Sequence, residues 1–345
     1  MVAICGMGMG SLASLLLRSG HSVRGSDAGI YPPMSQHLER LGIRVHEGYD
    51  AAHVAQDADL VIVGNAVSRG HVEVEAARAR GLPCLAMADA LTEFFLTERA
   101  PLVVTGTHGK TTVSFLLSHI LHAAGRDPGR FVGGLLQDGG EGARLGTGHE
   151  FVVEGDEYDN VYWDKTPKFL HYRPASGIIT SIEFDHADIY QSIEEIEARF
   201  AEFAALLPAD GTLVAGDGCP RLRRVAHHAR CKVETAGTSC EAVWRAVDLE
   251  EGSGGCSFTV VHGEEPLGRC SIPLPGRHNA ANAVAAVALA VSRGLEASAA
   301  MESLASFPGV RRRQEIRGVV DGVTGRSDGP AESPRKGGER SFRGD

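Results

Sequence analysis

The sequence predicts an α/β protein with two main domains, each built on a parallel sheet, and a small antiparallel part in the second. Short apolar runs alternate with helical patterns over residues 1–99, and a second series of this kind begins with P-L-V-V-T at 101–105. Strands that alternate with helices imply a parallel sheet with right-handed crossovers. A chain of 345 residues is also longer than one hydrophobic core usually serves.

The first domain is expected over residues 1–99. We expect strands at 2–5, 21–27 and 60–63, and helices at 11–19 and 71–80, the second of which ends at Gly81.

A glycine-rich turn, Gly6-x-Gly8-x-Gly10, joins the first strand to the first helix, and Asp27 ends the next strand. This is the context of a dinucleotide-type fingerprint, although Ser11 takes the place of the third glycine. Such a turn lets the backbone approach a diphosphate at a helix N-terminus. A tight turn without a ligand explains the motif equally well. In either case the first domain is predicted to be Rossmann-like.

The central domain is expected over residues 100–318. Its predicted strands lie at 101–105, 151–154 and 177–182, its helices at 111–124, 193–207 and 279–291, and short antiparallel strands at 242–274. Residues 319–345 form a third segment. Beyond Thr324 it is polar and has almost no large apolar side chain, so we expect disorder there.

The stretch T-G-T-H-G-K-T-T, residues 105–112, predicts a phosphate-binding loop of the P-loop type and hence a central ATPase domain. Gly109-Lys110-Thr111 fits the standard motif, but Val104 occupies the position of its first glycine. Lys110 can reach β- and γ-phosphates, and Thr111 can offer a hydroxyl to Mg²⁺. A glycine-rich helix cap is the alternative, but it would not need a lysine.

Two further side chains follow predicted strands. Glu154 ends the apolar run F-V-V and can supply the carboxylate that Mg²⁺ requires, although acidic runs at strand ends are often solvated turns. His186 lies just beyond another strand. A lone histidine is more often structural, and Mg²⁺ prefers oxygen, so the pattern does not assign it as a ligand.

Composition narrows the class of protein. A net charge of −10 argues against nucleic acid as a general partner. The seven cysteines form no C-x-x-C pair, which favours reduced thiols. We find neither a membrane span nor a signal peptide, so we expect a cytoplasmic protein without a membrane partner.

Together these motifs resemble the Mur ligase family, the ATP-dependent amide-forming enzymes of peptidoglycan synthesis. The family's phosphate loop G-T-H-G-K-T matches residues 106–111, and its E-x-D-E block matches 154–157. Its D-H block matches 185–186, and G-x-H-N-x-x-N-A matches 276–283. Four blocks in the family's order make this resemblance specific.

The resemblance implies ATP and Mg²⁺ as cofactors and assigns roles to individual residues. The catalytic residues would be Lys110, Glu154 and His186, and Mg²⁺ would be held by Thr111, Glu154 and His186. The ATP site would comprise Gly106, Thr107, His108, Gly109, Lys110, Thr111, Thr112, His278, Asn279, Asn282, Arg312 and Arg313. The UDP-sugar site would comprise Gly8, Met9, Gly10, Ser11, Asp27 and Asn65.

The activity implied is an ADP-forming ligase that joins a peptide to UDP-N-acetylmuramate through an acyl phosphate. The stretches D-E-Y-D, K-F-L-H-Y and D-H-A-D resemble the members that rejoin the recycled tripeptide L-Ala-γ-D-Glu-meso-diaminopimelate. Members that add L-alanine usually carry D-E-S-D and D-H-M-D, and they remain the alternative. D-E-Y-D and K-F-L-H-Y also disfavour a folylpolyglutamate or cyanophycin ligase.

The sequence departs from the family after Thr324. There the family continues with D-D-F-A-H-H-P into a third domain, which carries the incoming peptide's site. The polar tail has no such block, so we expect the third Mur ligase domain to be missing. Loss of that domain would leave the ligase inactive, and a non-catalytic two-domain protein that binds nucleotide or UDP-sugar is therefore a further hypothesis.

Overall fold

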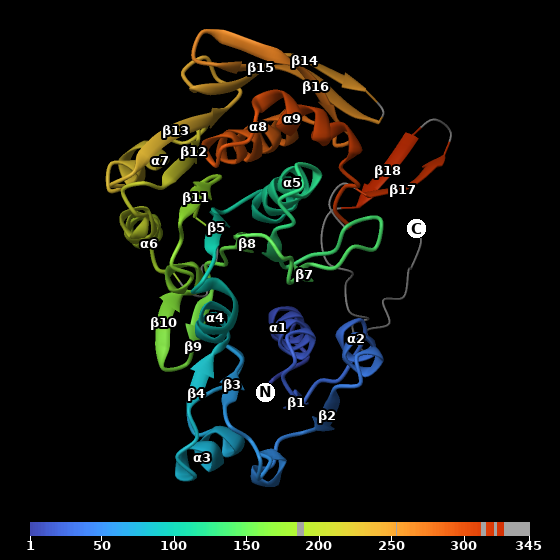
Figure 1. Ribbon diagram of the computed structural model, residues 1–345, viewed down its shortest axis with the longest axis vertical. Helices are drawn as coiled ribbons and strands as arrows, with labels where there is room; N and C mark the ends of the chain where they lie inside the picture. The colour runs from blue at the N-terminus through green and yellow to red at the C-terminus, as the bar shows by residue number, and fades with distance from the viewer. Residues whose placement is uncertain (185–189, 253, 312–314, 321–322, 328–345) are drawn as a thin grey trace, which may run out of the picture.

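The computed structural model describes residues 1–345 except 185–189, 253, 312–314, 321–322 and 328–345 (Figure 1). The N-terminal elements, blue to cyan in Figure 1, form the lower half of the view, and most of the elements that follow residue 100 lie above them. No helix in the described ranges is long and apolar enough to cross a membrane.

The N-terminal sheet is parallel, as predicted. β1 (Arg24–Asp27) pairs with β2 (Arg44–Glu47), and β3 (Val61–Val63) pairs with β4 (Cys84–Ala86). Val2 bridges β1 on one side and β3 on the other. The resulting order, β2-β1-Val2-β3-β4, is the 3-2-1-4-5 order of a Rossmann-like sheet.

The predicted strand at 2–5 is wrong beyond Val2. Ala3 adopts a φ of 60°, a left-handed conformation that takes the chain out of the ladder. The chain then turns directly into the first helix.

Short helices surround this sheet. They are α1 (Met7–Arg18), α2 (Met34–Arg40), α3 (Val72–Ala79) and α4 (Met87–Leu91), with the single turns η1 (Ala51–His53) and η2 (Thr92–Leu96). The helix expected at 11–19 begins at Met7, because extended Gly6 is already its N-cap. Its apolar face, Leu12, Leu15 and Leu16, is buried.

Ten strands of the described chain form the central sheet, in the order β16-β15-β14-β13-β12-β11-β5-β8-β6-β7. Its bounds are β5 (Ala100–Thr105), β6 (Gly129–Phe131), β7 (Ala143–Arg144), β8 (Glu150–Glu154), β11 (Ser176–Ile179), β12 (Thr212–Gly216), β13 (Lys232–Gly237), β14 (Trp244–Gly252), β15 (Gly255–His262) and β16 (Glu265–Ile272). The strands from β13 to β6 run parallel, and β14 to β16 form the predicted antiparallel part.

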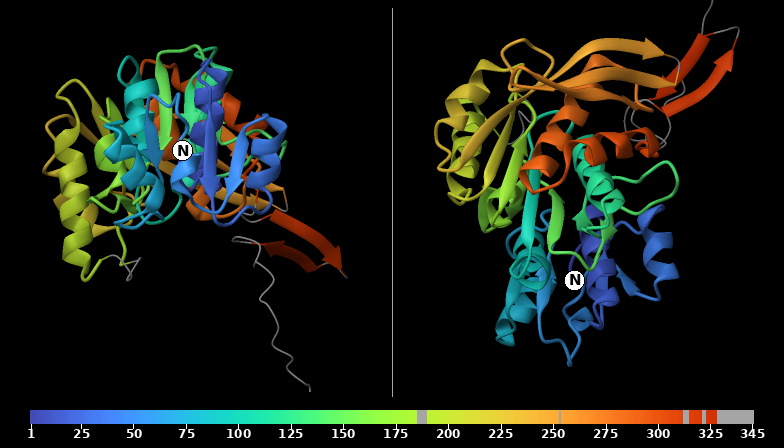
Figure 2. Two further views of the ribbon diagram at one scale, coloured as in Figure 1. Left: turned by 90° about the horizontal axis from the view of Figure 1, so that it is seen from below. Right: turned by 45° about the horizontal axis from the view of Figure 1, so that its top comes forward.

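Helices cover both faces of this sheet: α5 (Lys110–Ala123), α6 (Ile193–Leu206), α7 (Pro220–Ala226), α8 (Arg277–Ser292) and α9 (Ala297–Ser303), with the turns η3 (Lys168–His171) and η4 (Leu304–Ser306). β14 to β16 extend over α8 and α9 (Figure 2). A small hairpin of β9 (Asp159–Val161) and β10 (Asp164–Pro167) follows the E-x-D-E block.

β5 shows why the two faces have separate cores. Its residues alternate between the faces of the sheet, as side chains of a strand must. Leu102 and Val104 join the cluster under α5 and α8, whereas Val103 joins a second cluster with Phe200 and Phe203 of α6. The second cluster also contains Leu12 of α1, so one apolar core continues from the N-terminal sheet into the central sheet.

The end of the described chain forms a hairpin of β17 (Glu315–Val320) and β18 (Val323–Ser327). The disorder expected after Thr324 is therefore wrong for 325–327, because backbone pairing with β17 requires no apolar side chains there. Residues 328–345 lie outside the described residues.

Candidate active site

The phosphate loop connects β5 to α5 and is packed tightly against the segment after β11. Gly106 has a φ of +123°, and a Cβ there would lie 2.3 Å from Thr180 Oγ1. Thr107 N donates to Ser181 O at 2.9 Å, and His108 N donates to Ser181 Oγ at 3.0 Å. Gly109, the N-cap of α5, has a φ of 82°. Both positions thus require glycine, because the backbone there has a positive φ. The loop bends at these residues, and α5 begins where the loop ends.

Lys110 lies across the mouth of this loop. Its Nζ donates to Gly106 O at 2.6 Å, to Thr107 O at 3.3 Å and to the buried Glu157 Oε2 at 2.7 Å. All three ammonium protons therefore have acceptors. A phosphate that entered the loop would compete with the two carbonyls for a cation that is already in place.

Glu154 and Thr111 form an oxygen pair beside the loop. Thr111 Oγ1 donates to Glu154 Oε1 at 2.7 Å, and Gly133 N donates to Glu154 Oε2 at 2.7 Å. A hydroxyl and a carboxylate next to a phosphate loop fit Mg²⁺, which prefers hard oxygen ligands and keeps several waters. Within the described ranges no cluster of three or more His, Cys, Asp or Glu could hold a metal. His186 and its D-H block lie outside the described residues.

A cavity of about 250 Å³ lies between the loop and the N-terminus of α8. A Cβ on Gly109 would lie 2.8 Å from Asn282 Oδ1, which shows how closely α8 approaches the loop. The residues that line the cavity are Thr107, His108, Gly109, Lys110, Thr111, Thr112, Glu154, Leu274, His278, Asn279, Asn282 and Val310. The structure thus brings together the ATP-site residues predicted from blocks far apart in sequence. Gly106 of the loop is not among the residues that line the cavity, and Arg312 and Arg313 lie outside the described residues.

A larger cavity, of about 640 Å³, lies between the N-terminal and central sheets. Gly8, Met9, Asp27 and Asn65 of the predicted UDP-sugar site line it from one side. Lys110 and Glu154 line it from the other, and both also line the smaller cavity. The two cavities therefore share the loop lysine and the strand-end carboxylate as lining residues.

Gly10 and Ser11 are not among the residues that line this cavity. A Cβ on Gly10 would lie 2.1 Å from Met34 Sδ, so this glycine allows α2 to pack against α1.

Asp27 supports the glycine-rich turn. Its Oδ2 accepts a hydrogen bond from Cys5 N at 2.8 Å, and its Oδ1 accepts one from Gly29 N at 2.9 Å. Burial, together with the negative charge of Asp27, raises the pKa of the Cys5 thiol to about 11. Cys5 is therefore a neutral thiol at physiological pH.

The larger cavity also contains residues to which the sequence analysis gave no role. Lys168 and Tyr172 come from the K-F-L-H-Y stretch, and Asp156 and Tyr158 come from D-E-Y-D. In the sequence, both stretches only distinguish members of a family. The residue types in these stretches do not predict that they line a cavity together with the start of α1.

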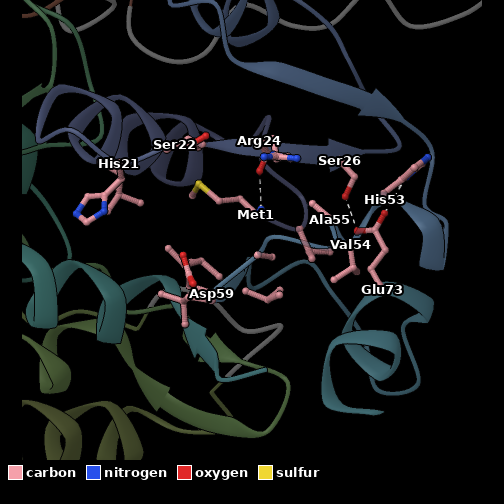
Figure 3. A pocket seen from close by; sticks show the side chains of 18 of the residues that line it. Met1, His21, Ser22, Arg24, Ser26, His53, Val54, Ala55, Asp59 and Glu73 are labelled. Atoms are coloured by element: carbon pink, nitrogen blue, oxygen red, sulfur yellow. Dashed lines mark hydrogen bonds and ion pairs between the residues drawn. The ribbon is translucent and has the colours of Figure 1, made fainter. Parts of the chain in front are cut away.

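A further cavity, of about 400 Å³, shares no residue with these two (Figure 3). In Figure 3, Ser26 and His53 point toward Glu73, which is hydrogen-bonded to Ser26 Oγ and lies 3.0 Å from His53 Nδ1. None of the predicted site residues lines it.

Comparison with known families agrees with this architecture. Residues 1–99 match the model of the Mur ligase family catalytic domain, and residues 104–290 match that of the Mur ligase middle domain. The chain belongs to the Mur ligase family, whose members are ATP-dependent, ADP-forming ligases. The resemblance and the α/β fold expected from the sequence are thus confirmed.

Individual relatives are similar over most of the chain. The UDP-N-acetylmuramate--L-alanyl-gamma-D-glutamyl-meso-2,6-diaminoheptandioate ligase of Escherichia coli is 38% identical over 323 residues, which are 94% of this chain and 70% of the relative. The UDP-N-acetylmuramate--L-alanine ligase of Salinispora arenicola is 38% identical over 326 residues, 94% of this chain and 62% of that protein. A similar structure is the crystal structure of the UDP-N-acetylmuramate:L-alanyl-gamma-D-glutamyl-meso-diaminopimelate ligase from Neisseria meningitides. It superimposes with a TM-score of 0.83 at 38% identity, over 90% of this chain and 98% of that one.

Proposed function

We propose that this protein is the ligase that joins L-Ala-γ-D-Glu-meso-diaminopimelate to UDP-N-acetylmuramate in peptidoglycan recycling, with conversion of ATP to ADP. The observation that carries the proposal is that Lys110 and Glu154 line both cavities. ATP in the smaller cavity and UDP-N-acetylmuramate in the larger one would meet at these side chains. This is the arrangement that transfer of the γ-phosphoryl group to the muramoyl carboxylate requires.

The chain's own residues would act mainly by electrostatics. The N-terminus of α5 and the Lys110 ammonium would offer N–H groups to the phosphates. Before they bind, Lys110 is paired with the carboxylate of Glu157. Thr111 and Glu154, with His186 as the family suggests, would hold Mg²⁺, which neutralises phosphate charge when bound. His278, Asn279 and Asn282 of α8 would contact the rest of the nucleotide, and we propose the same for Arg312 and Arg313.

The N-terminal domain would hold the nucleotide sugar. Gly8, Met9, Asp27 and Asn65 line the cavity at the carboxyl ends of the parallel strands, where ligands of such sheets bind. Gly10 and Ser11 would contribute through the shape of α1. Domain limits at 99/100 and 318/319 and a cytoplasmic location remain predictions.

L-Alanine is the alternative acceptor, because the relatives named for it reach the same 38% identity. The D-E-Y-D and K-F-L-H-Y stretches favour the tripeptide, and both contribute side chains to the larger cavity.

The test is ADP formation by the chain with ATP, Mg²⁺ and UDP-N-acetylmuramate, to which either the tripeptide or L-alanine is added. The ligase assignment requires turnover that depends on the tripeptide and is abolished in Lys110→Ala. Turnover with L-alanine only would assign the alternative ligase. Binding of both nucleotides without any ADP would favour the non-catalytic binding protein, and undiminished turnover in Lys110→Ala would rule out the assigned phosphate site.

A further inference from the structure

Lys168 is a buried cation in the wall of the larger cavity. It begins η3, directly after the β9–β10 hairpin, and only 7% of its side chain is exposed. Its Nζ donates to Asp156 Oδ2 at 2.7 Å and lies 5.8 Å from the centre of the Tyr158 ring. Among the described residues, Asp156 provides the one hydrogen-bond acceptor of this ammonium.

An ammonium group has three N–H donors, and burying it without acceptors is costly. Lys110, in the same cavity, has three acceptors. Lys168 therefore retains donors that nothing in the described part of the chain satisfies. A ligand anion in the cavity would supply the missing acceptors.

The other charged groups of the cavity wall already have partners. Glu154 accepts from Thr111 and Gly133, and Asp27 accepts from Cys5 and Gly29, so both oxygens of each are engaged. Asp156 Oδ1 accepts from Tyr158 N at 3.2 Å. Lys110 and Lys168 are the two cations in this wall. Lys168 can thus donate to an anion without giving up an existing hydrogen bond, whereas Lys110 cannot.

The backbone that carries Lys168 is firmly anchored. The ring of the next residue, Phe169, is fully buried and stacks on Phe200 with centroids 5.3 Å apart. It meets Phe203 edge-on at 5.6 Å. A cation on such a support is pre-organised for a ligand, because little freedom remains to be lost on binding.

We infer that Lys168 recognises the lactyl carboxylate of the muramate and so determines the choice between nucleotide sugars. The inference rests on the proposed function, in which UDP-N-acetylmuramate occupies this cavity. The carboxylate is the group that distinguishes this ligand from UDP-N-acetylglucosamine, which lacks the lactyl ether. Lys168 would bind it beside Lys110 and Glu154, where the reacting oxygen has to lie.

The test is calorimetric binding of UDP-N-acetylmuramate and UDP-N-acetylglucosamine to the full 345-residue chain. We expect the wild type to prefer the muramate, and Lys168→Met to reduce that preference by about 10- to 100-fold, the worth of a charge-assisted hydrogen bond. Binding of UDP-N-acetylglucosamine should stay unchanged. Lys168→Arg should keep part of the preference.

Lys165→Met is the matched control. Lys165 lies on the same hairpin, is 68% exposed and pairs with Asp159 at 2.7 Å, so its loss should leave both affinities unchanged. Lys168→Gln is a second variant, because its amide can still donate to Asp156. It supports the inference if it folds and loses the preference.

The outcomes separate the inference from the proposed function. A wild type that prefers the muramate, with Lys168→Met and Lys168→Gln retaining the preference, overturns the inference alone. Equal weakening of both ligands also overturns it, because Lys168 would then only support the wall. A wild type that binds neither nucleotide sugar overturns the proposed function and the inference with it.

Discussion

Thr111 Oγ1 donates a hydrogen bond to Glu154 Oε1 at 2.7 Å, and this contact connects the first turn of α5 to the end of β8. The second oxygen of Glu154 is bonded to Gly133 N, so the carboxylate has a fixed orientation beside the phosphate loop. The pair is the part of the proposed magnesium site that the described residues contain.

Removal of either partner should weaken the binding of Mg²⁺-ATP. Loss of an oxygen ligand or of its orienting hydrogen bond typically reduces metal affinity by about 10- to 100-fold. We expect Thr111→Val and Glu154→Gln to lose most of the increase in ATP affinity that Mg²⁺ causes, while ATP binding in EDTA changes little. Calorimetric titration with and without Mg²⁺ measures this. The control is Glu302→Gln, a surface position of α9, and an unchanged Mg²⁺ effect in both site variants would contradict the assignment.

Gly106→Ala should destabilise the protein and impair the loop. At a φ of +123° a Cβ would lie 2.3 Å from Thr180 Oγ1 and 2.8 Å from Ser181 N. Strained backbone of this kind costs about 1–3 kcal/mol, so the urea midpoint should fall and ATP should bind more weakly. Gly218→Ala serves as the control, because its φ is ordinary and its Cβ would have no neighbour within 4 Å. Equal stabilities of the two variants would disprove the strain.

Phe169→Ala should cost about 3–5 kcal/mol in the free energy of unfolding, as truncation of a fully buried aromatic residue does. The cavity would open between Phe200 and Phe203, beneath the backbone that carries Lys168. Phe169→Leu fills part of this space and should lose less. Urea denaturation of the three proteins gives the values, and a loss below about 1 kcal/mol for alanine would show that the cluster does not support the cavity wall.

Asp89 of α4 and His171 of η3 form an ion pair at 2.8 Å, and the strength of this pair should depend on pH. Burial opposes the charge of Asp89, but hydrogen bonds from His171 and Asn160 outweigh it and lower the pKa of the carboxyl below 3.8. A carboxyl with a lowered folded pKa contributes stability that is present above its unfolded pKa and is lost as pH falls through the folded value.

Wild type should therefore exceed Asp89→Asn in the free energy of unfolding at pH 6, and the difference should shrink as pH falls from 4 toward 3. Urea titrations of both proteins between these limits test it. A difference that stays constant with pH would show that the ionised carboxyl is not what His171 stabilises.

The sequence was most informative where structure depends on neighbours along the chain. Apolar runs predicted β5 and β8, and Gly109 with Lys110 marked the start of α5. These signals are local, because strand alternation, glycine conformation and helix caps act over a few residues. The predicted strand at 2–5 was wrong because Ala3 leaves the ladder with a left-handed φ, and no neighbouring residue type signals that conformation.

The residue types and order of the chain thus established two α/β units, the phosphate loop and the carboxylate that follows the next buried strand. Tertiary structure alone decided that Lys110 and Glu154 line two cavities at once, that Gly10 packs against Met34, and that Lys168 lines the same cavity as the start of α1. These relationships join residues distant in sequence, and packing rather than local preference brings such residues together. A buried lysine with one acceptor becomes recognisable only when the whole wall around it can be inspected.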